Sequence, residues 1–249
     1  LSYTGSTVIR AGTLQLATAG TLAITSIEIR GGTLQFTNGD DNAAAGGYVA
    51  NRIGASVPIT WAGGGITFTE NVNAIGNHNL GATTLAGGNT LTITQTGVAA
   101  PSTVTFANLD RSGSNRGTLT ISANSLGLAQ SPIGGARVFA TQINGAAPAA
   151  SLIGGGGAVG STTQSILPWA WSSTASNFLT YGADGFRPLQ QSETEVNLLN
   201  SPGSATVNSR TSTTQTLTAP RTVNSLFHNS NSAISGAFDL TLTSGALAT

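Results

Sequence analysis

The chain has 249 residues with nine basic and nine acidic side chains, so its formal net charge is zero, and only 7% of its positions are charged. The nine cations are all Arg and form no basic stripe, which excludes a nucleic-acid interface that follows a phosphate backbone. Cysteine is absent, which excludes disulfides and thiolate metal sites. No run reaches the roughly 18 uncharged apolar residues of a membrane-spanning helix, so no membrane-spanning segment is expected.

An internal repeat occupies the first part of the chain. Residues 9–16 read IRAGTLQL, and twenty positions later residues 29–36 read IRGGTLQF. Apolar and polar residues alternate in each copy, as in a β-strand with one buried face. A period near twenty suits one coil of a solenoid, in which each coil pairs with the next and none buries its inner face alone. The sequence therefore predicts an all-β fold, a right-handed parallel β-helix.

The alternation also predicts which side chains face the interior. Gln15 and Gln35 should face outward, because a one-residue slip in register would bury both and expose the apolar residues beside them. The residues expected in the core are Leu14, Leu16, Leu34 and Phe36.

The repeat places two arginines where their positive charges would repel each other. Arg10 and Arg30 occupy equivalent outer positions, where stacked like charges repel. Glu28 lies two residues before Arg30 on the same face, and we expect it to offset that repulsion.

Further strands with period-two alternation follow in chain order. They are expected at residues 65–68, 90–93, 103–106, 118–121 and 239–242. Glycine-rich segments at residues 63–65 and 87–89, and Gly117, separate these strands. Corners between sheet faces need positive φ, which glycine supplies without steric cost. No helical period is sustained beyond two turns, so only short helical turns are expected.

Two less regular segments divide the chain. Residues 131–164 contain four consecutive glycines and read as irregular coils or a long loop. Residues 191–204 are polar and read as a junction. Such a junction would join one module to the next without breaking the solenoid.

The repeat over residues 3–36 resembles a known motif. Residues 3–16, which read YTGSTVIRAGTLQL, are similar to the passenger-associated β-strand repeat of autotransporter-like proteins. Residues 51–61, 166–171 and 178–186 look more loosely like later parts of the long modules in giant bacterial surface or fibre proteins that carry this repeat. The resemblance implies a parallel β-helix displayed outside the cell. On this resemblance residues 1–190 form one β-solenoid module, residues 191–204 are the junction, and residues 205–249 begin a further solenoid module. Nothing in the chain resembles the membrane β-barrel that ends an autotransporter.

On this resemblance, the expected function is structural. The chain would be a non-enzymatic segment of an exported cell-surface or extracellular shaft of a fibre or adhesin, giving rigidity and self-association. No catalytic residues, cofactor or metal are expected. The chain has no initiating Met and opens inside the motif, so we expect continuation into further repeat modules or end-to-end docking of chains.

A second interpretation is a glycan-binding adhesin module. If residues 168–172 are extended, Trp169 and Trp171 lie on one face, where two indoles can stack on sugar rings, with Tyr181 nearby. The competing interpretation is that the two aromatic residues fill the core of a coil or close the end of a module.

A third interpretation is a polysaccharide-active β-helix enzyme. Glu193 and Glu195 would share a face if they lie on a strand, and glycoside hydrolysis needs two carboxylates about 5–9.5 Å apart. Their segment is polar, and we expect a solvated acidic turn instead.

The remaining candidate residues have ordinary structural explanations. Asp40 and Asp41 lie in a turn-like segment, with a calcium loop as the alternative. His78 and His228 are far apart in sequence, cannot form a local metal motif, and are expected at exposed polar positions.

Overall fold

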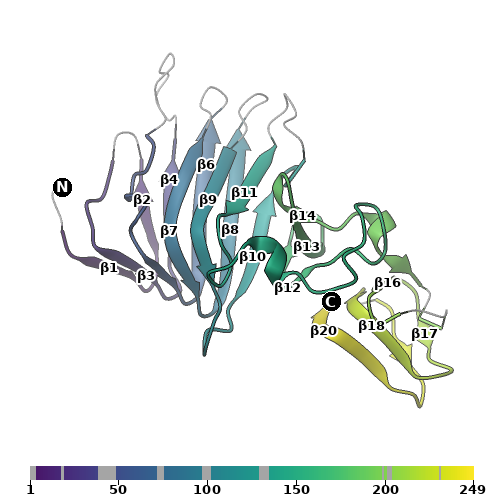
Figure 1. Cartoon of the computed structure of the whole chain (residues 1–249). Coiled ribbons are helices and arrows are strands. Elements are labelled where there is room, and N and C mark those ends of the chain that lie inside the picture. Colours follow the sequence, from purple (N-terminus) through teal and green to yellow (C-terminus); the bar gives the residue numbers. More distant parts are fainter. Residues whose placement is uncertain are drawn as a thin grey trace. The chain divides into compact units, whose positions relative to one another are not determined.

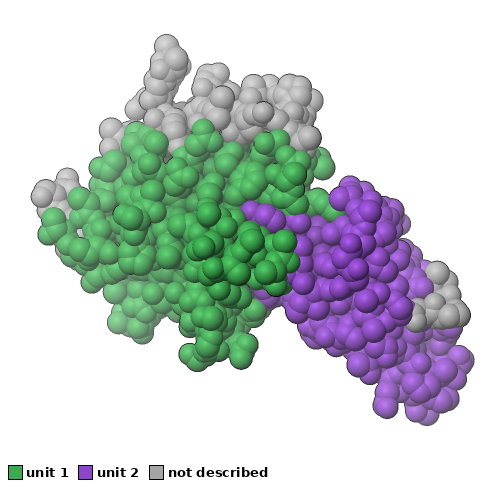
Figure 2. All heavy atoms as spheres, in the orientation of Figure 1, with its two compact units in different colours: residues 1–151, 172–175, 182–187 green, residues 152–171, 176–181, 188–249 purple. Residues whose placement is uncertain are grey.

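The computed structural model describes residues 4–17, 20–38, 49–71, 76–96, 102–128, 135–197, 199–200, 204–229 and 231–249. The chain divides into two compact units (Figure 2). The first comprises Leu1–Ser151, Ser172–Ala175 and Gly182–Arg187, and the second comprises Leu152–Trp171, Ser176–Tyr181 and Pro188–Thr249. The predicted division into two modules rests on the resemblance and on the polar junction between them, and it stays a prediction.

The first unit winds through two parallel sheets in turn (Figure 1). Odd-numbered strands form the first sheet: β1 (Ser6–Ile9), β3 (Ser26–Ile29), β5 (Ile59–Trp61), β7 (Asn77–Leu85), β9 (Ser102–Asp110) and β11 (Ala136–Ala140). Even-numbered strands stack in the second: β2 (Thr13–Leu16), β4 (Thr33–Thr37), β6 (Gly64–Asn71), β8 (Gly88–Thr96) and β10 (Thr118–Ala123). Pairing of each strand with the next but one along the chain defines a parallel β-solenoid and confirms the predicted fold class.

The pairing register shows why the repeat has a period of twenty. Thr13 pairs with Thr33, so the first coil has 20 residues. Further along the same ladder Thr33 pairs with Gly65, Gly65 with Thr90 and Thr90 with Thr120, giving coils of 32, 25 and 30 residues. The strands stay in register while the coil length changes, so the difference in length comes from the residues that connect one strand to the next along the chain.

The predicted inward side chains lie where the alternation placed them. Leu16, Leu34 and Phe36 are buried, and Leu14 on the first coil is half-buried. Gln15 is exposed and Gln35 is partly exposed on the outer face. The inner row continues along the ladder as Leu14, Leu34, Ile66, Leu91 and Ile121, of which the last four have no exposed surface. Burial of this continuous apolar row stabilises the first unit through the hydrophobic effect.

The outer charges of the repeat also pair as expected. The Nε atom of Arg30 donates a hydrogen bond of 2.6 Å to Oε1 of Glu28. Both side chains keep contact with solvent, so the pair contributes at most about 1 kcal/mol.

Two kinds of constraint select glycine at the corners. Gly63 and Gly64 have φ of 118° and 85°, as predicted for a corner. A Cβ on Gly64 would also overlap the carbonyl oxygen of Gly32 in the coil before it. Gly87 and Gly117 have no positive φ, contrary to the prediction; a Cβ there would meet the backbone of Ala62 or Leu85 instead. Close approach of adjacent coils explains these two glycines.

The segment predicted to be irregular contains little regular structure. Within residues 135–164 it forms β11, which pairs in register with β9, and a single 3-10 turn, η1 (Pro148–Ser151). After it the chain forms β12 (Leu167–Ser172), β13 (Asn177–Gly182) and β14 (Gly185–Pro188), whose residues are divided between the two units.

The second unit has a parallel sheet of its own. The strand order is β15 (Glu195–Val196), β16 (Asn208–Thr211), β18 (Arg221–His228) and β20 (Leu240–Ala248), and β17 (Gln215–Thr216) pairs with β19 (Ile234–Ser235). The short turn η2 (Gln191–Glu193) precedes β15. One apolar cluster comprises Ile166, Phe178, Leu189 and Ala246, and another comprises Leu199, Leu217 and Leu226.

The inward row of the first unit gives a direct test of the register. Leu34→Asp should destabilise the protein by more than the about 2–5 kcal/mol that truncation of a buried Leu to Ala costs, because it places an unpaired carboxylate in the core. Gln35→Asp, one residue away on the outer face, is the matched control and should lie within about 1 kcal/mol of the wild type. Denaturant unfolding measures both, and equal losses would contradict the register.

Candidate functional site

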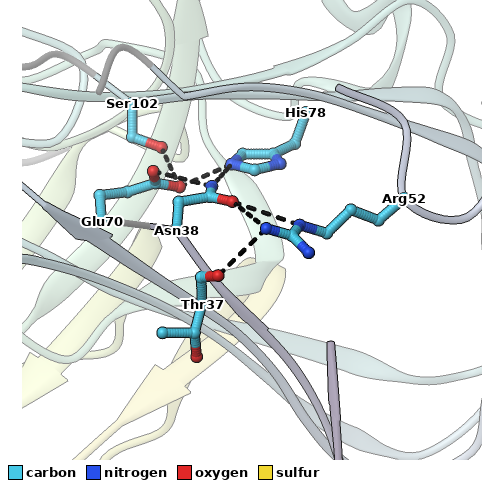
Figure 3. Close-up of polar contacts among 6 residues, drawn as sticks. All are labelled: Thr37, Asn38, Arg52, Glu70, His78 and Ser102. Carbon is cyan, nitrogen blue, oxygen red and sulfur yellow. Dashed lines mark hydrogen bonds and ion pairs between the residues drawn. The ribbon is translucent and has the colours of Figure 1, made fainter. Parts of the chain in front are cut away.

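A buried polar cluster interrupts the apolar core at one corner of the first unit. Phe36 and Phe68 stack in adjacent coils, with ring centroids 4.7 Å apart and planes within 8°. The next residue on the same side of each strand is polar: Asn38 follows β4, and Glu70 lies in β6. Both side chains are at least 98% buried. The cluster comprises the side chains of Asn38, Arg52, Glu70, His78 and Ser102 and the backbone carbonyl of Thr37, and Figure 3 shows these groups converging.

Arg52 binds the backbone of two coils. Its Nη1 donates to the carbonyl of Gly20 at 2.9 Å, and its Nη2 donates to the carbonyl of Thr37 at 3.2 Å. Nε and Nη2 also donate to Oδ1 of Asn38, at 3.2 and 2.9 Å. The planar guanidinium is thus held by acceptors in fixed directions, as this side chain requires when it is buried.

Asn38 connects the cation to a carboxylate. Its Nδ2 donates to Oε2 of Glu70 at 3.0 Å. Arg52 can only donate and the Glu70 carboxylate can only accept, so these neighbours fix which way the Asn38 amide points. The positive charge of Arg52 and the negative charge of Glu70 are therefore joined through a neutral amide inside the core.

His78 approaches the same carboxylate from the opposite sheet. Its Nε2 lies 2.6 Å from Oε1 of Glu70, and both side chains are almost fully buried. The ring also lies against Phe68, with centroids 4.2 Å apart. Ser102, at the start of β9, is 3.5 Å from Oε1 of Glu70 through its hydroxyl, a long contact. One carboxylate thus meets the residue that follows β4, a residue of β7 and a residue of β9.

The order of these contacts does not fit a nucleophilic triad. In such a triad the imidazole lies between the hydroxyl and the carboxylate. Here Glu70 lies between Ser102 and His78. The cavity beside the cluster, lined in part by Phe36, Arg52 and His78, measures about 10 Å³, which is room for about one water molecule. The contacts of the cluster instead join successive coils, as those of Arg52 with Gly20 and of Asn38 with Glu70 do.

The three aromatic residues predicted to bind glycans all lie in the second unit. Trp169 is 8% exposed. Trp171 packs on the apolar cluster, with its ring 5.3 Å from Phe178 and 5.5 Å from Phe227. Tyr181 is partly exposed. Part of the indole surface is thus used for packing, as the core interpretation expects, and the glycan-binding role stays a prediction.

The prediction of a solvated acidic turn at Glu193 and Glu195 is wrong. Glu193 is fully buried, and its two carboxylate oxygens accept 2.8 Å hydrogen bonds from the backbone N–H groups of Gly160 and Gln190. Glu195 is 2.6 Å from Nη2 of Arg221. The first carboxylate supports two turns of backbone and the second forms an ion pair.

The prediction for His78 is also wrong, because the side chain is 4% exposed. His228 is partly exposed and contacts the hydroxyl of Thr211 through Nδ1 at 2.9 Å. Asp40 and Asp41 lie outside the described residues. Among the residues that are described, no group of three or more His, Asp or Glu side chains could hold a metal ion.

The sequence contains a signal for the cluster that none of the predicted motifs includes. Asn38 and Glu70 follow Phe36 and Phe68 at the same two-residue spacing, so polar groups occupy an inward position in two successive coils. A buried carboxylate there requires a donor, which could have directed attention to Arg52 and His78. The corner residues that carry Arg52 follow no strand period.

Searches against known protein families, curated proteins and solved structures found no match. The fold class therefore rests on the strand ladders themselves, which define a parallel β-solenoid. The resemblance to the autotransporter-associated repeat stays a prediction. None of the helices in the described part of the chain is long and apolar enough to cross a membrane.

Removing the carboxylate of the cluster should destabilise the protein strongly. Glu70→Ala breaks the buried contact with His78 and removes the acceptor of the Asn38 amide, and breaking a buried pair in this way costs about 3–5 kcal/mol. Glu28→Ala breaks the exposed pair with Arg30 and is the matched control, with an expected loss below about 1 kcal/mol. Thermal or denaturant unfolding compares the two. Similar losses would show that the buried cluster does not brace the coils.

Metal chelation should leave the fold unchanged. The carboxylates are few and scattered along the sequence, and no repeated calcium-binding motif is present. A melting experiment with and without EDTA measures this. A fall of the melting temperature on chelation, restored by calcium, would reveal a calcium loop, with Asp40 and Asp41 the first residues to substitute.

Proposed function

We propose that this protein is a structural, non-enzymatic segment of a shaft, part of an exported cell-surface or extracellular fibre or adhesin. The observation that carries the proposal is the unbroken in-register pairing of β2, β4, β6, β8 and β10. Each coil of such a ladder is buttressed by its neighbours, so repetition adds length without a new core design.

Composition supports the same function. Threonine, serine, asparagine and glutamine supply the polarity of the chain, and few positions are charged. Equivalent positions of adjacent coils lie about 4.8 Å apart, where like charges repel and hydroxyl or amide groups can hydrogen-bond. A chain without cysteine also has no disulfide whose formation depends on the redox potential of its compartment.

The buried polar cluster suits a mechanical role. Arg52, Asn38 and Glu70 join atoms of successive coils by charge-assisted hydrogen bonds that are shielded from water. Sliding one coil past another would separate these groups and leave buried charges unpaired. The cluster therefore resists slippage in register, to which an all-apolar row offers less resistance.

Imaging native material tests the proposal. An antibody raised against this chain should label filaments or surface projections in negative-stain electron microscopy of intact cells. Cells lacking the gene for the chain are the control for labelling. Label confined to the cell interior, or turnover of a polysaccharide by the purified chain, would contradict a structural extracellular role.

A glycan-binding function is the second candidate, because Trp171 and Tyr181 keep part of their surface exposed. Under this alternative the purified chain binds specific glycans on an array, and Trp171→Ala and Tyr181→Ala weaken binding. Trp169→Ala, which alters a more deeply buried indole, should weaken binding less at equal stability. An array without specific binding would remove this candidate.

A further inference from the structure

The outer face of strands β2 to β10 carries a regular grid of threonines. Apolar residues alternate inward along these strands, so the residues between them point outward. In β6, β8 and β10 the outward positions form the patterns Thr67-x-Thr69, Thr90-x-Thr92-x-Thr94 and Thr118-x-Thr120-x-Ser122. All eight of these side chains are exposed or partly exposed.

The register aligns the threonines across the sheet. Thr67 pairs with Thr92 and Thr92 with Ser122, while Thr69 pairs with Thr94 and Thr90 with Thr120. No register shift interrupts these pairings. The grid therefore repeats at about 4.8 Å between coils and about 6.6 Å along each strand. In β2 and β4 the middle column is glutamine, so the most regular part covers β6, β8 and β10.

The face has a uniform chemistry. Its described outward residues in β2, β4, β6, β8 and β10 are Thr, Gln, Ser and Gly, with no charged and no aromatic side chain among them. The outer face of the other sheet differs, because it carries Glu28 and Arg137. Threonine presents a methyl group beside a hydroxyl and is stiff about χ1, so its hydroxyls are held in place by the backbone.

A partner for this face must match its neutral charge and its periodicity in two directions. We infer that the outer face of β6, β8 and β10 binds the surface of ice, whose oxygen atoms repeat with spacings close to those of the grid. The hydroxyls extend the hydrogen-bonded water lattice, and the methyl groups fill gaps between water molecules. Water ordered over the grid before contact joins the growing crystal, and the bound protein then slows the growth of that surface.

A crystalline polysaccharide is the other partner with a two-dimensional repeat. Proteins bind sugar rings largely by stacking aromatic side chains on them, and the described residues of this face include no aromatic side chain. The chemistry therefore favours ice. This inference does not depend on the shaft function, because a shaft with or without ice binding has the same ladders.

Thermal hysteresis, the difference between the melting and freezing points of ice in a solution of the purified chain, tests the inference. The wild type should depress the freezing point below the melting point, shape ice crystals and inhibit their recrystallisation. Thr92→Tyr, in the centre of the grid, should abolish these effects by holding the face away from the crystal. Thr105→Tyr places the same change on the outer face of the other sheet, between Asn79 and Phe139, and should keep them.

Both variants are first compared by circular dichroism and melting, so that a loss of folding is not taken for a loss of binding. Thr67→Tyr provides a second position on the grid in case Thr92→Tyr fails to fold. The inference is overturned if the wild type shows neither thermal hysteresis nor inhibition of ice recrystallisation. It is also overturned if the folded grid variants keep the full effect of the wild type on ice. Binding to microcrystalline cellulose or chitin that Thr92→Tyr abolishes, without an effect on ice, would assign the face to polysaccharide instead.

Discussion

Parallel pairing of each coil with the next is the constraint on which the rest of the first unit depends. It forces the side chain at a given position to stack on its counterpart one coil away, about 4.8 Å distant. Apolar rows satisfy this condition inside, as in the ladder from Leu34 through Ile66 to Leu91. Neutral hydroxyl rows satisfy it outside. Low charge and abundant threonine are therefore consequences of the pairing.

The buried cluster shows how such a ladder accommodates charge. Glu70 has no like charge stacked beneath it, since the position one coil earlier holds Asn38. The amide accepts from Arg52 on one side and donates to Glu70 on the other, so each buried charge meets a fixed dipole. The polar row thus keeps the stacking geometry of the apolar rows beside it while changing their chemistry.

Local patterns predicted the fold well and the buried polar groups poorly. The repeat over residues 9–36 placed Leu34 and Phe36 inside, because alternation reports directly which face is buried. Glu193 was predicted at the surface but is buried, since its partner Gly160 is 33 residues away and nothing in the polar sequence around Glu193 indicates that contact. Arg52 was missed for a similar reason, as its backbone acceptors Gly20 and Thr37 are 32 and 15 residues away in the sequence. Contacts across coils depend on corner lengths, which the repeat does not determine.

The unequal coils show that the number of residues in a coil does not determine how far that coil advances along the solenoid. Coils of 20 and 32 residues contribute the same advance along the ladder, because only the strands pair. Residues inserted at a corner therefore change the surface at that level and leave the neighbouring levels in place. Evolution can vary corner loops one level at a time, each as an independent site for new contacts, on a scaffold whose spacing is set by backbone hydrogen bonds alone.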